Sequence, residues 1–189
     1  MAHARMVDAF VRDLLNDFFD GDVEGEGPRY RLPLPVRPVV QVVPGAGNGL
    51  RVQITTSVAH DVASGPDLFA ALNDANAQLP YGRLFVVDGR VLMEETVLGE
   101  TVDEESLDNA IRVVAWAARR FGEPLAAAGG GTPALDLEPT AADDAAAASG
   151  LAAGPPADGE LRLGPASEGI AEVAPPVTGP LTVNAAGYL

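Results

Sequence analysis

The fold is set by the stretch LPYGRLFVVDGRVLMEET, which occupies residues 79–96. Its pattern predicts the end of a helix, a tight corner, a strand, a turn at Asp88-Gly89 and a second strand. Asp-Gly between two β-branched runs is a strong hairpin signal, because both central residues of the favoured turn take positive φ. We therefore predict a β-hairpin, and the helical patterns on either side of it indicate a compact α+β domain.

The chain before the hairpin alternates between helical and strand-like patterns. Residues 4–19 show helical spacing in two neighbouring stripes, Met6, Phe10, Leu14 and Phe18 beside Val7, Val11 and Leu15. Three strand-like runs follow, at residues 29–34, 39–43 and 50–58. In the third run apolar or β-branched residues alternate with Arg51, Gln53, Thr55 and Ser57, which predicts one covered and one solvated sheet face.

Two further helices complete the predicted domain. Residues 66–79 return to helical spacing, and Thr101 to Glu104 fits a capping box at the start of the last helix. That helix is predicted to reach about Phe121 and to be stopped by Gly122 and Pro124. The order α-β-β-β-α-β-β-α predicts an antiparallel sheet of about five strands with helices packed on one face.

Composition divides the chain at about residue 122. Residues 1–122 hold nine of the ten aromatic side chains, and residues 123–189 hold only Tyr188. The second part is rich in Ala, Gly and Pro, and its nine acids against Arg162 give a net charge of −8. Such a segment cannot bury enough apolar surface to offset its ordering entropy. We predict a folded domain at 1–122 and a disordered acidic tail at 123–189.

Charge and residue usage exclude several functional classes. The chain has a net charge of −15, contains no lysine and has twelve arginines. A surface of this kind repels phosphate backbones and anionic lipids, so we predict neither nucleic-acid nor membrane binding. The absence of cysteine excludes disulfides and thiol chemistry. Acids interrupt the N-terminal apolar pattern, which argues against a signal peptide and favours a cytoplasmic location.

No motif carries a recognisable catalytic set. The Gly-rich loop at 44–49 joins two strands and lacks the lysine of a Walker A loop, which predicts a hairpin turn. Ser57, His60 and Asp61 are the residue types of a hydrolase triad, but they lie within five positions. Glu94 and Glu95 are adjacent on a strand and point to opposite faces, so they cannot act as a pair, although one of them could be covered and its pKa raised. We predict no catalytic residue, cofactor or metal.

Two segments have the composition of an interface. On the last helix Trp116 lies opposite the core stripe, with Val113 and Arg120 beside it, and such clusters are typical of contact surfaces. Coverage by the tail or by the first helix is the alternative explanation. In the tail, residues 179–189 cluster β-formers and an aromatic, so Leu181, Val183 and Tyr188 are candidates for docking on a sheet edge. The alternative is a terminus that stays disordered.

The helix end LNDANAQLPYGR at 72–83, the hairpin, and Val97-Leu98-Gly99 before the last helix resemble the YbjN-like and type III secretion chaperone-like domains. The resemblance covers roughly residues 4–122. It implies an α-β-β-β-α-β-β-α fold and a non-enzymatic module, often dimeric, that binds a peptide or protein. The alternatives are an adaptor whose tail is the ligand of another protein, and a small-molecule hydrolase that uses His60 and nearby carboxylates.

Overall fold

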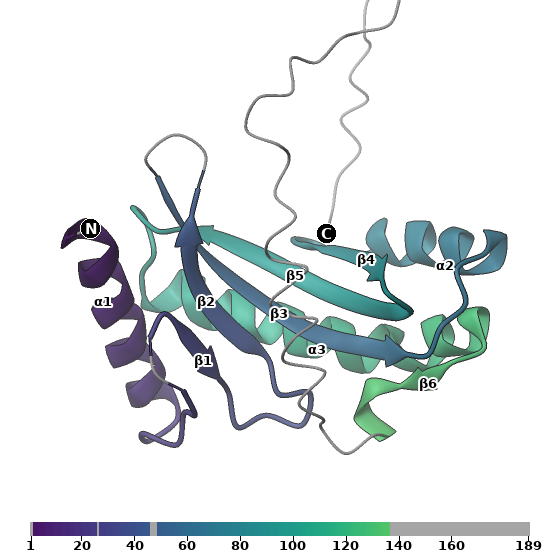
Figure 1. Ribbon diagram of the computed structural model, residues 1–189, viewed down its shortest axis with the longest axis horizontal. Coiled ribbons are helices and arrows are strands. Elements are labelled where there is room, and N and C mark those ends of the chain that lie inside the picture. Colours follow the sequence, from purple (N-terminus) through teal and green to yellow (C-terminus); the bar gives the residue numbers. More distant parts are fainter. Residues whose placement is uncertain (1, 26, 46–48, 137–189) are drawn as a thin grey trace, which may run out of the picture. The chain divides into compact units, whose positions relative to one another are not determined.

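The computed structural model describes residues 2–25, 27–45 and 49–136 (Figure 1). Along the chain it forms α1 (Ala2–Phe18), β1 (Arg29–Arg31), β2 (Val39–Pro44), β3 (Leu50–His60), α2 (Pro66–Asn76), β4 (Arg83–Val87), β5 (Arg90–Leu98), α3 (Glu104–Gly129), β6 (Thr132–Pro133) and the 3₁₀ turn η1 (Ala134–Asp136). The predicted order of three helices and five strands is confirmed, and β6 and η1 follow it. Of the predicted tail, residues 123–136 belong to these elements, and residues 137–189 lie outside the described residues.

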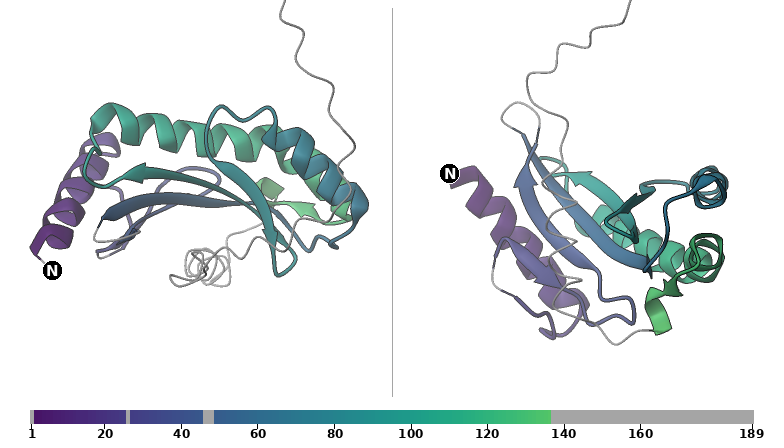
Figure 2. Two further views of the ribbon diagram at one scale, coloured as in Figure 1. Left: turned by 90° about the horizontal axis from the view of Figure 1, so that it is seen from above. Right: turned by 45° about the vertical axis from the view of Figure 1, so that its right-hand side comes forward.

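The strands form one antiparallel sheet in the order β1-β2-β3-β5-β4, and β6 pairs with the end of β3. Figure 2 shows α3 and α2 on one side of this sheet, and α1 at its β1–β2 end. Buried side chains of all three helices share a single core with one face of the strands. The predicted fold class, an antiparallel α+β sheet with helices on one face, is confirmed, with six strands in place of about five.

The β4–β5 hairpin has the geometry that its sequence predicts. Asp88 has φ 49° and Gly89 has φ 74°, as a type I′ turn requires. The turn fixes the register, because Val87 pairs with Arg90 and Arg83 with Glu94. Each side chain of the hairpin is thereby assigned to one face of the sheet.

The first and last helices pack through the stripes that helical periodicity singles out. On α1 the inner stripe is Val7, Val11 and Leu15, and on α3 the buried set includes Leu107, Ile111, Val114 and Phe121. The Tyr30 hydroxyl donates a 2.9 Å hydrogen bond to Asp8 Oδ1 and so ties β1 to α1. Burial and this carboxylate both raise the pKa of Tyr30, so the tyrosine stays neutral and keeps its proton for the bond.

The start of α3 differs from the prediction. Asp103 is the N-cap, its side chain accepts a 2.8 Å hydrogen bond from the Ser106 N–H, and Ser106 Oγ accepts one from the Asp103 N–H. The predicted capping box at Thr101 and Glu104 is therefore wrong by two residues. Thr101 instead closes a turn after β5, because its N–H donates to the Leu98 carbonyl. α2 also ends at Asn76, three residues before the predicted end.

The end of α3 differs more. The helix passes Gly122 and Pro124 and continues to Gly129, where Gly130 takes the left-handed conformation (φ 67°) that ends it. The predicted stop at Phe121 is wrong, because burial of Leu125 in the core outweighs the backbone hydrogen bond that Pro124 cannot make. β6 then pairs with β3, so the described fold continues past the boundary predicted near residue 122.

Candidate functional site

One face of the sheet carries none of the described helices. Directly paired residues of antiparallel strands share a face, and the pairs Gln41–Gln53, Thr55–Glu94 and Arg83–Glu94 lie opposite the helix side. We call this side of β1 to β5 the open sheet face. The strands arch toward α3, so the open sheet face is the concave side (Figure 2).

Polar side chains at the centre of the open sheet face are buried. Gln53 and Thr55 were predicted to be solvated, yet their exposed fractions are 3% and 1%, and that of Glu94 is 5%. Leu92, between them and the hairpin, is fully buried outside the main core. The predicted wet face is therefore wrong at its centre, although the predicted alternation of the strand is correct.

Hydrogen-bonding atoms without a partner concentrate on this face. Among the described residues, six buried side-chain nitrogen and oxygen atoms have none, and five are on the open sheet face: Gln41 Oε1, Arg51 Nε, Gln53 Oε1, Thr55 Oγ1 and Glu94 Oε2. Each such atom costs about 1–3 kcal/mol relative to a bonded one. They belong to three adjacent strands, β2, β3 and β5, and so form one cluster on this face.

Every arginine in the described strands is on the open sheet face: Arg29, Arg31, Arg51, Arg83 and Arg90. Glu94 is the one strand carboxylate described on this side, and Glu24 pairs with Arg31 at the margin of the face. The whole chain, by contrast, carries a net charge of −15. The fold has gathered the arginines of its strands on the one face that the described helices leave uncovered.

Arg83 contacts both an acidic and an aromatic side chain of this face, Glu94 and Phe85. Its Nη2 donates to Glu94 Oε1 at 3.0 Å, and its guanidinium lies 5.0 Å from the centre of the Phe85 ring. Glu94 Oε2 stays without a partner. On the helix side Glu95 is 9% exposed, and burial raises the pKa of its carboxyl group. The two glutamates point to opposite faces, as predicted.

Both outer edges of the sheet are occupied by the chain itself. At β1, the main chain of Glu24 exchanges two hydrogen bonds with Arg31, at 3.1 and 2.8 Å. At β4, the side chain of Asn76 accepts from the Leu84 N–H at 2.7 Å and donates to the Leu84 carbonyl at 3.0 Å. These contacts use main-chain groups that an added strand would need. Strand addition at either edge would therefore have to displace these contacts.

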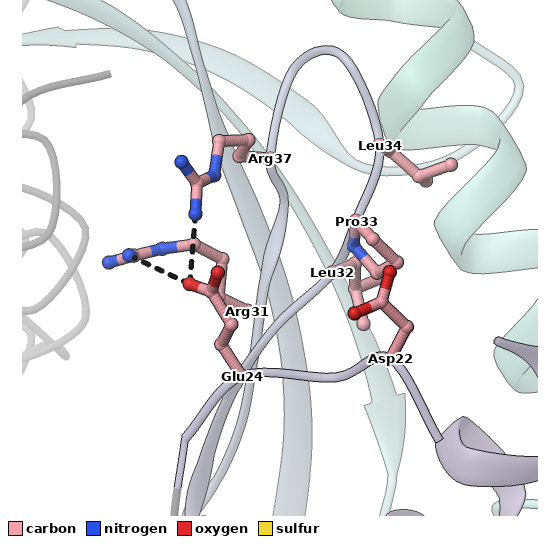
Figure 3. Close-up of a pocket in the computed structure, with 7 residues that line it drawn as sticks. All are labelled: Asp22, Glu24, Arg31, Leu32, Pro33, Leu34 and Arg37. Atoms are coloured by element: carbon pink, nitrogen blue, oxygen red, sulfur yellow. Dashed lines mark hydrogen bonds and ion pairs between the residues drawn. The ribbon is translucent and has the colours of Figure 1, made fainter. Parts of the chain in front are cut away.

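A shallow pocket of about 300 Å³ adjoins the open sheet face beyond β1 (Figure 3). Glu24 Oε2 accepts hydrogen bonds from Arg37 Nη2 at 2.8 Å and from Arg31 Nη1 at 3.5 Å, and Figure 3 shows both guanidinium groups turned toward it. Glu24 is 65% exposed in its side chain, so these ion pairs are weak. The contact with Glu24 places the Arg31 side chain at the margin of the open sheet face.

The interface residues predicted on α3 differ in their exposure. Trp116 is 40% exposed, and its ring meets Phe121 edge-on, with 5.6 Å between the ring centres. Arg120 is exposed and lies 5.8 Å from the Phe121 ring centre, whereas Val113 is half-buried against the core. Leu181, Val183 and Tyr188 are outside the described residues. Binding at Trp116 stays a prediction.

The residues of the hydrolase alternative are spread along the end of β3. His60 is buried and its backbone pairs with Thr132 of β6, Ser57 is half-buried on the open sheet face, and Asp61 is exposed with φ 55°. Within the described ranges, no group of three or more histidine and acidic side chains is placed to hold a metal ion.

The open sheet face could not be recognised as a site from the sequence alone. The signal was present as arginines two residues apart, at 29 and 31, followed by Arg51, Gln53 and Thr55 at the same spacing. Period-two alternation puts each set on one face. The pattern does not show that all five strand arginines lie on the same side of the assembled sheet.

Comparison with known proteins identifies a family. A family model described as T3SS (YopN, CesT) and YbjN peptide-binding chaperone 1, or TY-Chap1, matches residues 4–137. No curated protein matches the chain. In the described part of the chain, no helix is long and apolar enough to cross a membrane. The match spans most of the chain and confirms the resemblance inferred from its sequence: this chain belongs to the TY-Chap1 family of peptide-binding chaperone domains.

Proposed function

We propose that the chain binds an extended polypeptide segment on the open sheet face, as a non-enzymatic, chaperone-like module of the cytoplasm. The observation that carries the proposal is the cluster of five buried polar atoms without partners on that face. The peptide-binding description of the family supports it. His60 takes part in the β3–β6 pairing rather than in this cluster, so the proposal gives it no catalytic role.

An extended peptide matches the chemistry of the cluster. Gln41, Gln53 and Glu94 each present an acceptor oxygen, Arg51 presents a donor, and the Thr55 hydroxyl can do both. A peptide main chain offers N–H and C=O groups in alternation, so it can serve acceptors and donors that lie on strands about 4.8 Å apart. Apolar neighbours such as Leu92 add contact area for its side chains.

Replacing Thr55 with valine tests the proposal. The change keeps the shape and removes a buried hydroxyl that has no partner, so the free energy of unfolding should rise by about 1 kcal/mol. The affinity for a peptide in which Glu and Leu alternate, chosen to match the arginines, should fall severalfold. Urea denaturation measures the first effect and titration calorimetry the second. Tighter peptide binding by the variant would contradict the proposal.

Thr56→Val is the matched control, because Thr56 is the next residue and equally buried but faces the helices. Its hydroxyl donates a hydrogen bond to the Val36 carbonyl. Removing that donor should lower the free energy of unfolding by about 1 kcal/mol, and peptide affinity should stay unchanged. The two adjacent substitutions therefore have opposite expected signs.

A second contact surface is proposed at Trp116, either as a homodimer seam or as a groove for another protein. An exposed tryptophan next to the exposed Arg120 has hot-spot composition. Trp116→Ala should weaken self-association or partner capture by about 2 kcal/mol. Because the buried stripe of α3 stays intact, the melting temperature should change little. Sedimentation and calorimetry measure the two effects, and a large stability loss with unchanged association would overturn this idea.

A further inference from the structure

The exposed side of α3 combines the tryptophan with three arginines. Arg112 precedes Trp116 by four residues, and Arg119 and Arg120 follow it by three and four. Residues at these spacings are neighbours on the surface of a helix. All four residues are exposed, and residues 109–122 contain no acid. We call these four residues the Trp116 cluster.

Two of the three guanidinium groups form no ion pair in the described part of the chain. Arg112 is held by Asp108, whose Oδ2 accepts a 2.7 Å hydrogen bond from the arginine Nε. Arg119 and Arg120 form no hydrogen bond or ion pair with a described residue, although Glu123 lies on the next turn. The cluster therefore presents positive charge beside an exposed indole, in a chain whose net charge is −15.

A second copy of the chain does not fit the Trp116 cluster. A two-fold contact brings the same patch of both copies together. If two α3 helices crossed antiparallel at Trp116, Arg112 of each would meet Arg120 of the other, because both lie four residues from the crossing point. A parallel two-fold contact would bring each arginine close to the same arginine of the second copy. Like charges opposed in this way disfavour association.

An acidic amphipathic helix matches both the charge and the spacing of the cluster. Arg112 and Arg119 are seven residues apart, which is about 10 Å along the helix axis. Glutamates seven residues apart on a partner helix have the same separation, and an apolar residue between them would meet Trp116. A guanidinium group can bind a carboxylate through two parallel hydrogen bonds. Tryptophan and arginine are also enriched among the residues that dominate binding energy at interfaces.

We propose that the Trp116 cluster binds an acidic amphipathic helix of a different protein. This inference rests on the second contact surface proposed above, because it names the class of partner and decides against the homodimer seam. It is independent of peptide binding on the open sheet face.

Charge reversal in the full chain is the first test. The probe is a synthetic helical peptide with a central leucine and with glutamates three and four residues before and after it. Arg119→Glu combined with Arg120→Glu should weaken its binding about tenfold in titration calorimetry, because attractive pairs become repulsive. The matched control is Arg5→Glu with Arg12→Glu, which changes two exposed arginines of α1 and gives the same net charge. The control should bind the peptide as the unchanged chain does.

A peptide with lysines in place of the glutamates provides the converse test. It should bind the Arg119→Glu, Arg120→Glu variant about tenfold more tightly than it binds the unchanged chain. Binding gained in this way requires a folded α3, so it separates the effect of charge from a loss of structure. Thr55→Val should leave the affinity for the acidic helix unchanged, because Thr55 is on the open sheet face.

The outcomes separate this inference from the surfaces proposed above. Equal losses in the α3 variant and the α1 control, or no binding of the acidic helix to any variant, would overturn it. If Trp116→Ala weakened acidic-helix binding and the arginine reversal did not, the contact surface would stand and the acidic class of partner would be wrong. A dimer of the unchanged chain that Trp116→Ala dissociates in sedimentation would also overturn the inference, in favour of the homodimer seam. Failure of the alternating Glu–Leu peptide to bind would contradict only the function proposed for the open sheet face.

Discussion

Replacing Leu125 with alanine is expected to lower the free energy of unfolding by about 3 kcal/mol. Leu125 lies one residue beyond Pro124, is 1% exposed and belongs to the main core. The truncation removes buried methyl groups and leaves a cavity between α3 and the sheet. Urea denaturation at constant m-value measures the effect.

The control for this prediction is Glu123→Ala, an exposed change two residues earlier on the same helix, which should stay within about 0.5 kcal/mol. If the folded domain ended near residue 122, both substitutions would be neutral. A cost at Leu125 alone would show that the helix after Pro124 is part of the cooperative unit. We accordingly propose that the folded domain extends at least to residue 136.

Asn76→Ala should lower the free energy of unfolding by about 2 kcal/mol, because it leaves two main-chain groups of Leu84 without partners. The Asn76 amide bonds both the N–H and the carbonyl of Leu84 on the outer edge of β4. Hydrogen exchange at the Leu84 amide should accelerate in the variant. The uncovered edge should also increase aggregation, because unpaired strand edges pair with other chains.

Asn73→Ala serves as the comparison for Asn76, since Asn73 is exposed on the same helix. Its effect on stability should be within about 0.5 kcal/mol. Unchanged exchange at Leu84 in Asn76→Ala would mean that water replaces the side chain fully, and the proposed protection of this edge would then be wrong.

Local rules were sufficient for the hairpin and for the helix phases. The turn at Asp88-Gly89 depends only on two neighbouring residues, and the buried stripes of α1 and α3 depend only on periodicity. Tertiary packing decided the rest. Pro124 alone predicts the end of a helix, but the burial of Leu125 favours its continuation. The alternating pattern predicts that Gln53 and Thr55 are solvated, but both are buried in the assembled sheet.

The candidate site was harder to predict than the fold, because it is made by the assembly of strands. No segment of the sequence contains more than two of the five strand arginines close together, at Arg29 and Arg31. Their common side follows only from the register of four strand pairs. The tryptophan surface, by contrast, lies within one helix, and helical geometry was enough to place Trp116 outward.

The position of Trp116 also determines what the intrinsic tryptophan fluorescence of the protein can report. It is the only tryptophan of the chain and is 40% exposed on α3, a helix that lies on the side of the sheet opposite the open sheet face (Figure 2). A ligand on that face would leave the indole partly exposed to solvent, so its fluorescence emission maximum would not shift. Self-association through α3 would bury the indole and shift its emission maximum to shorter wavelength. A single intrinsic chromophore thus distinguishes the two contact surfaces without any label.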